Sequence, residues 1–182
     1  MEALAPPSSD LAQAEPGDLF EVSEPSGNGF ASLFHAERNL QAAIEEGRSL
    51  LLIASSVGIG PMRAAIDWPP VLAGAASGHN PVTLLYHCGD SLESAVGVED
   101  WDDWRASNVH VIPCFGTLEP KEADAGAGGP RTVIEDALFR GETGIAARMR
   151  GSPAVLVAGL PGPIAARVVR NFAEVNCLFC DL

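Results

Sequence analysis

Short apolar runs alternate with helix-forming segments along most of the chain. Each run holds five to seven residues and lies between turn residues, as is typical of strands buried on both faces of a sheet. These predicted strands are 49–54, 81–87, 109–113, 154–158 and 177–181. The segments between them predict helices at 61–67, 98–107, 132–140 and 163–174. The alternation predicts an α/β fold, a doubly wound five-stranded parallel sheet.

The regular pattern begins only near residue 49. Residues 1–15 are acidic and rich in Ala, Pro and Ser, which predicts a flexible lead. In the segment 16–48, residues 17–23 alternate as a strand would, and 33–46 contain helix formers with irregular apolar spacing. The Ala- and Gly-containing stretch 72–78 is interpreted as a loop.

Charge narrows the class of partner. The chain has 182 residues and a net charge of −13. Its 11 basic residues are one lysine, Lys121, and otherwise arginines. A binder of nucleic-acid backbone or of an anionic membrane surface needs a basic patch, and the arginines are scattered. No apolar run reaches the length of a membrane span. We therefore expect no nucleic acid and no membrane span.

The four cysteines favour a reduced protein. Cys177 and Cys180 form a Cys-x-x-Cys, but the two residues between them are apolar, whereas redox and metal motifs usually lie on turns or helix starts. We expect buried thiols and no metal site. The acidic N-terminus has no signal-peptide core, which favours the cytoplasm or an organelle stroma after removal of any transit peptide.

Ligands of parallel sheets bind beyond the carboxyl ends of the strands, so the loops there are the candidates. The loop 55–61 has glycines before a helix start, a pattern that suits a phosphate or a tight turn without a ligand. The loop 158–163 leaves the same two alternatives. Arg63 and Arg131 are candidate phosphate cations, although each is also consistent with a surface arginine.

The run 99–104 combines acids with Trp101 and Trp104. Acids suit the first turn of a helix, and indoles three residues apart share one face. We expect this helix to pack its tryptophans on the sheet, with an acidic docking face as the alternative.

Four segments occur in the order seen in one family. Ser55-Ser56-Val57-Gly58-Ile59-Gly60-Pro61 matches half of a T-G-x-G-I-x-P loop, and 84–89 partly matches a Tyr/Gly-Cys-Arg loop. Ala158-Gly159-Leu160-Pro161 resembles a Cys-Gly-Pro loop, and residues 17–30 resemble the last strand of a flavin-binding barrel. In these segments the chain resembles the pyridine-nucleotide domain of the ferredoxin–NADP reductase superfamily.

The resemblance implies a domain order and a cofactor site. Residues 16–48 would be the remnant of the flavin domain's last strand with a linker, and 49–182 the NAD(P)-binding-like domain. The cofactor would be NAD(H) or NADP(H), with Asp90 at the adenosine ribose favouring NAD(H). The implied cofactor-binding residues are Ser56, Gly58, Ile59, Gly60 and Pro61 at the pyrophosphate loop, Cys88 and Asp90 after the second strand, and Gly159, Leu160 and Pro161 beside the nicotinamide.

The chain also departs from that family. Val57 would obstruct the close backbone approach that glycine allows, and Ala158 replaces the family's cysteine. The flavin barrel is absent, so FAD would come only from a missing segment or a partner. Two functions remain: the NAD(P)H-binding part of a flavin-linked oxidoreductase that works with a flavin-domain or electron-transfer partner, or a non-catalytic subunit of a larger assembly. No catalytic residue is assigned.

Overall fold

Five parallel strands form the sheet at the centre of the molecule. The computed structural model describes residues 15–16, 40–119, 131–149, 152–172 and 177–179. The strands follow the order β3-β2-β1-β4-β5, and each neighbouring pair is parallel. Their bounds are β1 (Leu50–Ser55), β2 (Val82–His87), β3 (Val109–Cys114), β4 (Ala154–Ala158) and β5 (Cys177–Phe179). The predicted parallel α/β sheet is confirmed.

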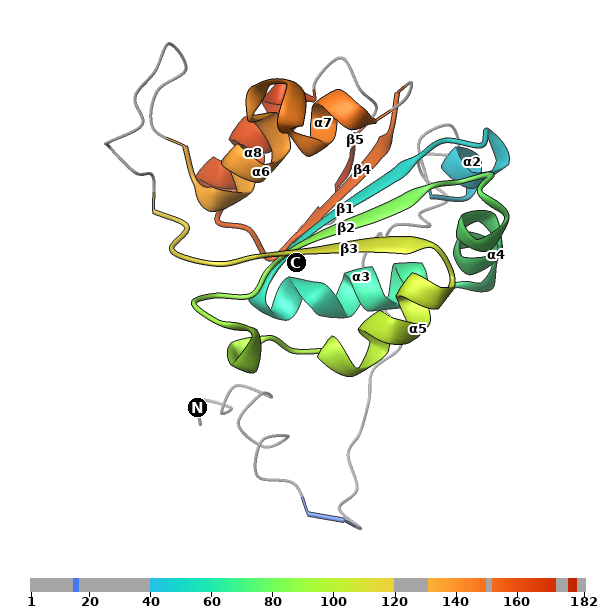
Figure 1. The fold of residues 1–182 in the computed structure, drawn as a ribbon, viewed down its shortest axis with the longest axis horizontal. Coiled ribbons are helices and arrows are strands. Elements are labelled where there is room, and N and C mark those ends of the chain that lie inside the picture. The colour runs from blue at the N-terminus through green and yellow to red at the C-terminus, as the bar shows by residue number, and fades with distance from the viewer. Residues whose placement is uncertain (1–14, 17–39, 120–130, 150–151, 173–176, 180–182) are drawn as a thin grey trace, which may run out of the picture.

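Helices cover both faces of the sheet (Figure 1). Helices α3, α4 and α5 lie on one face, and α6, α7 and α8 on the other. The α-helices are α2 (Leu40–Glu45), α3 (Ile59–Ile66), α4 (Pro69–Ser77), α5 (Trp101–Ala106), α6 (Val133–Phe139), α7 (Ile145–Arg148) and α8 (Gly162–Asn171). Short 3-10 turns are η2 (Ser56–Gly58), η3 (Leu92–Ser94), η4 (Val98–Asp100) and η6 (Gly141–Thr143).

Strand β1 explains why the apolar runs lack alternation. All six of its residues are buried, with Leu50, Leu52 and Ala54 in the core beneath α3 and α5. Leu51 and Ile53 belong to the second core, beneath α6 and α8. Since successive side chains of a strand point to opposite faces, a strand covered on both faces has no polar side to present.

The expected packing of the tryptophans is confirmed. Trp101 and Trp104 are both buried in the core on the α3 side. The indole Nε1 of Trp104 donates to Asp67 Oδ1 at 2.9 Å, which connects α5 to the end of α3. On the other face, Arg167 of α8 forms an ion pair with Glu135 of α6.

Some sequence predictions need correction. The predicted loop 72–78 is wrong, because residues 72–77 belong to helix α4 and Gly78 is its C-cap. Two prolines occupy the first turn of α4, and Val71, Gly74 and Ala75 form its buried side. Prolines pre-set the backbone of a first helical turn, and the alanines that follow have the highest helix propensity. Helix α7 was not predicted. The predicted strand 17–23 lies outside the described residues, and so do Cys180 and Asp181.

The helix expected over 33–46 is described only from Leu40. No helix among the described residues has both the length and the apolar character needed to cross a membrane.

Candidate nucleotide site at the carboxyl edge

Two glycine loops pack directly against each other at the centre of the carboxyl edge. A Cβ on Gly58, in the loop after β1, would lie 2.3 Å from the carbonyl oxygen of Ala158. A Cβ on Gly159, after β4, would lie 2.1 Å from the carbonyl oxygen of Ser55, and Gly159 also has a φ of +71°. These two positions therefore require glycine, for close packing at both and for conformation at Gly159.

Strands β1 and β4 are neighbours, yet the chain leaves β1 towards β2 and leaves β4 towards β5. This arrangement is the topological switch point, where open α/β sheets bind ligands. The packed loops lead into α3 and α8, two helices whose first turns carry Gly60 and Gly162. A Cβ at either glycine would meet no atom within 4 Å. Open backbone at a helix start is a feature that phosphate binding uses. In α3, however, the Ile59 N–H already bonds the carbonyl oxygens of Ser56 and Val57, and Pro61 has no N–H.

The first loop holds Val57, whose predicted obstruction of a close backbone approach stays a prediction. The backbone with positive φ is at Ser56, whose φ is 49°, and not at Val57. The Val57 side chain is 82% exposed. Ser56 is exposed as well, and its carbonyl oxygen accepts from the Tyr86 hydroxyl at 3.5 Å. Ile59 is buried, so only its backbone is offered to a ligand.

The loop after β2 carries Cys88 and Asp90. Cys88 is 4% exposed, and burial raises the pKa of its thiol to about 11. The thiol therefore stays protonated near neutral pH, where it is a weak nucleophile. Asp90 is exposed. The Ser94 hydroxyl lies 2.8 Å from the carbonyl oxygens of Cys88 and Ser91, which folds this loop back on itself.

Sequence reasoning missed a chain of hydrogen bonds across the strand ends. Ser55 Oγ lies 3.0 Å from His87 Nδ1, and His87 Nε2 lies 2.6 Å from the carbonyl oxygen of Gly116. Because a carbonyl oxygen only accepts, Nε2 carries a proton, so in the neutral imidazole Nδ1 accepts and the Ser55 hydroxyl donates. The contacts assign this tautomer, and they join the ends of β1 and β2 to the loop after β3.

A pocket of about 260 Å³ lies over these groups. The structure brings Ser56 and Cys88 together there, but Leu160 and Pro161 are not among its lining residues. The lining consists of Ser55, Ser56, Tyr86, His87, Cys88, Gly89, Ser94 and Val96. The pocket and the two glycine loops are thus adjoining parts of one edge, joined through Ser55.

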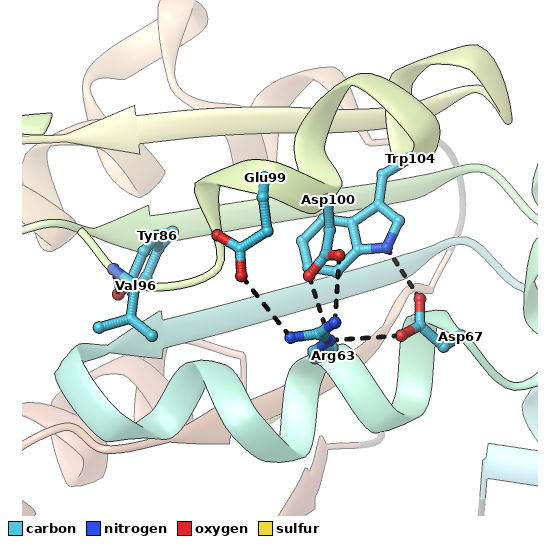
Figure 2. Close-up of polar contacts among 7 residues, drawn as sticks. All are labelled: Arg63, Asp67, Tyr86, Val96, Glu99, Asp100 and Trp104. Carbon is cyan, nitrogen blue, oxygen red and sulfur yellow. Dashed lines mark hydrogen bonds and ion pairs between the residues drawn. The ribbon is translucent and has the colours of Figure 1, made fainter.

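Arg63 is surrounded by acids (Figure 2). Its guanidinium contacts both carboxylate oxygens of Asp100, at 3.1 and 3.2 Å, and lies within 4 Å of Glu99 and of Asp67. Three carboxylates around one cation leave no net positive charge for a phosphate. Arg63 was predicted either to bind a phosphate or to be a surface arginine. These contacts disfavour phosphate binding.

Arg131, the other candidate cation, also has a structural partner. Its guanidinium donates to the carbonyl oxygen of Phe139 at 3.0 Å, at the last turn of α6. This contact satisfies a carbonyl group that the helix end leaves free. Among the described residues, no group of three or more His, Cys, Asp or Glu is placed to hold a metal ion.

Comparison with known proteins shows that the fold of this chain is similar to that of solved structures. No protein-family model and no curated protein matches the chain. A mutant ferredoxin-NADP+ reductase from Plasmodium falciparum, solved with 2'P-AMP, is similar over 78% of this chain with a TM-score of 0.50 and 14% identity. Another structure of that reductase with 2'P-AMP gives a TM-score of 0.48 at 14% identity, also over 78% of this chain.

The chain spans 57% of the length of these reductase chains. An identity of 14% shows a shared fold and no more. The expected fold resemblance to ferredoxin–NADP reductase is confirmed at this level, whereas the cofactor residues and the domain boundaries remain predictions.

Proposed function

We propose that the chain is the NAD(H)-binding part of a flavin-linked oxidoreductase. The observation that supports this most is the direct packing of Gly58 on Ala158 and of Gly159 on Ser55 at the switch point. That packing sets the open first turns of α3 and α8 at the position where α/β sheets hold a pyrophosphate.

The proposal assigns a role to each predicted site residue. The backbone from Ser56 to Pro61 would hold the pyrophosphate, with Gly60 giving open access. Asp90 would accept a hydrogen bond from the adenosine ribose. Residues 159–161 would flank the nicotinamide. Cys88, buried and protonated, would form part of the floor without contacting the reacting atoms.

The charges favour NAD(H) over NADP(H). The Plasmodium reductase structures contain 2'P-AMP, which carries the extra phosphate of NADP. In this chain Arg63 is neutralised by carboxylates, and Asp90 and Glu93 are exposed on the loop after β2. Like charges repel, so these acids oppose a 2'-phosphate. A dinucleotide without that phosphate fits the residues present.

In such an enzyme a hydride passes between the nicotinamide and the flavin: one supplies it and the other accepts it. The chain's own contribution would be to bind and orient the dinucleotide. The flavin would be held elsewhere, by another segment or by a partner protein. In this reading residues 16–48 are the end of a flavin domain with a linker, and 49–182 are the nucleotide-binding domain.

A second candidate is a reductase-like subunit that binds a partner and catalyses nothing. The large apolar side chains most exposed among the described residues all follow strands at the carboxyl edge. They are Val57 after β1, Leu92 and Val96 after β2, and Phe115 after β3. Exposed apolar side chains that share one edge of a sheet are a feature of protein interaction surfaces.

Two experiments separate the candidates. Calorimetry of the purified chain with NADH, NADPH and AMP tests the nucleotide site, and Arg63→Gln should leave NADH affinity within about twofold because Arg63 is already neutralised. For the second candidate, a Leu92→Ser/Val96→Ser variant should lose a co-purifying complex that Ala147→Ser, on α7, retains. A chain that binds no nucleotide but loses its partner in that variant supports the second candidate.

A further inference from the structure

A second pocket lies far from the nucleotide site, near the amino ends of the strands. Its volume is about 320 Å³, and its lining includes Thr83 of β2, His110 of β3 and Arg148 of α7. Thr83 and His110 are partners across the parallel pair. Thr83 lies four residues before His87 in β2, or about 13 Å at 3.3 Å per residue. The two pockets therefore lie towards opposite ends of the strands.

The polar side chains that line this pocket can all donate a hydrogen bond, and none is an acid. Ser49 and Thr83 contribute hydroxyls, His110 an imidazole and Arg148 a guanidinium. The described residues that line the pocket include no Asp or Glu, although the whole chain has a net charge of −13. The Arg148 guanidinium is exposed and has no ion pair with any other described residue. The local charge is thus opposite in sign to that of the chain.

The rest of the lining is apolar. Ile112, Ile145 and Met149 are partly buried and pack against the core beneath α6 and α8, and Pro81 completes the wall. A ligand that fits must therefore combine an anionic head with an apolar body. At about 30 Å³ for each water-sized group, the volume holds about ten such groups, which is the size of a small organic molecule.

We propose that this pocket binds a small organic carboxylate with an apolar body. The carboxylate would lie against the guanidinium of Arg148 and the hydroxyls of Thr83 and Ser49, because a planar guanidinium and hydroxyl donors satisfy both of its oxygens. The apolar body would lie along Ile112 and Met149. The site is independent of the nucleotide site, and neither proposal needs the other.

Octanoate is a suitable probe because it has ten non-hydrogen atoms, and octanamide is its neutral counterpart. Amide chemical shifts of the isotope-labelled full chain, recorded during each titration, give both the location and the affinity. We expect octanoate to shift signals from the starts of β2 and β3 and from α7. We expect octanamide to bind at least about tenfold more weakly, since a charge-assisted contact is lost.

Arg148→Gln is the test variant, and Arg170→Gln, an exposed arginine on α8, is the matched charge control. Arg148→Gln should weaken octanoate about tenfold and abolish the preference over octanamide, while Arg170→Gln should change neither. Thr83→Val, which keeps the side-chain shape, should also weaken octanoate. The proposal is overturned if octanoate fails to bind at millimolar concentration or binds no better than octanamide. Shifts confined to other surfaces, or equal affinities in both arginine variants, overturn it as well.

Discussion

Gly159 packs against Ser55 so closely that a single methyl group on the glycine would lie 2.1 Å from the serine carbonyl oxygen. This contact joins the loops of two neighbouring strands at the switch point. The contact is between backbone atoms, so it requires that residue 159 has no side chain. It sets the positions of the two loops that form the candidate site.

Replacing Gly159 by alanine should therefore destabilise the fold. The added methyl meets backbone atoms, and the φ of +71° strains any L side chain, so we expect a loss of at least about 2 kcal/mol in the free energy of unfolding. Urea denaturation measures this loss. Gly162→Ala is the matched control, because its Cβ meets no atom within 4 Å, and it should be neutral or stabilise by up to about 1 kcal/mol. Equal stability of the two variants would contradict the packing.

The Ser55–His87 contact predicts a defined imidazole tautomer. Because His87 Nε2 donates to the Gly116 carbonyl at 2.6 Å, the neutral imidazole accepts from Ser55 at Nδ1. Long-range proton–nitrogen spectra of the neutral imidazole should show a protonated Nε2 and a bare Nδ1. Ser55→Ala leaves that buried nitrogen without its donor and should cost about 1–3 kcal/mol. A protonated Nδ1 in the wild-type protein would refute the assignment.

Glu135 should make folding stability depend on pH. Burial raises the pKa of this carboxyl, but hydrogen bonds from Arg167 and Thr132 outweigh burial, and the net pKa is lowered. Arg167 Nη2 lies 2.9 Å from one carboxylate oxygen and Nε lies 2.6 Å from the other. A lowered folded pKa gives stability that is present above the ordinary glutamate value of about 4.3 and is lost as pH falls through the folded value.

Glu135→Gln should therefore lower the unfolding free energy by about 1.5–3 kcal/mol at pH 7, where a charged hydrogen-bonded group is lost. The gap between variant and wild type should narrow as pH falls below about 4. Urea denaturation over a pH series provides both values. Glu142→Gln, an exposed carboxylate on η6, should change stability little at any pH. A gap that is constant with pH would argue against the ion pair.

The strands were predictable because burial on both faces leaves uninterrupted apolar runs, as in β1 and β4. Helix α4 was missed because its two prolines and its small residues are also frequent in loops, and only the buried contacts of Val71 and Ala75 decide between the two. Tertiary packing outweighed the local signal there.

The sequence predicted where the candidate site lies in the fold but not which side chains contact each other there. Glycines after β1 and β4 mark the edge, since such loops follow parallel strands. The pairing of Ser55 with His87 depends on strand register, where the two residues are partners across β1 and β2, and no local pattern reveals a register. Arg63 shows the same limit: Asp67 is four residues away in the sequence, but Asp100 meets it only through the fold.

The most direct test of the proposed function is calorimetric titration of the full chain with NADH and with NADPH under identical conditions. We expect NADH to bind with one site per chain, and NADPH to bind at least about tenfold more weakly, because Asp90 and Glu93 repel a 2'-phosphate and Arg63 is neutralised. Absence of NADH binding at millimolar concentration, or NADPH binding as tight as NADH, would contradict the account.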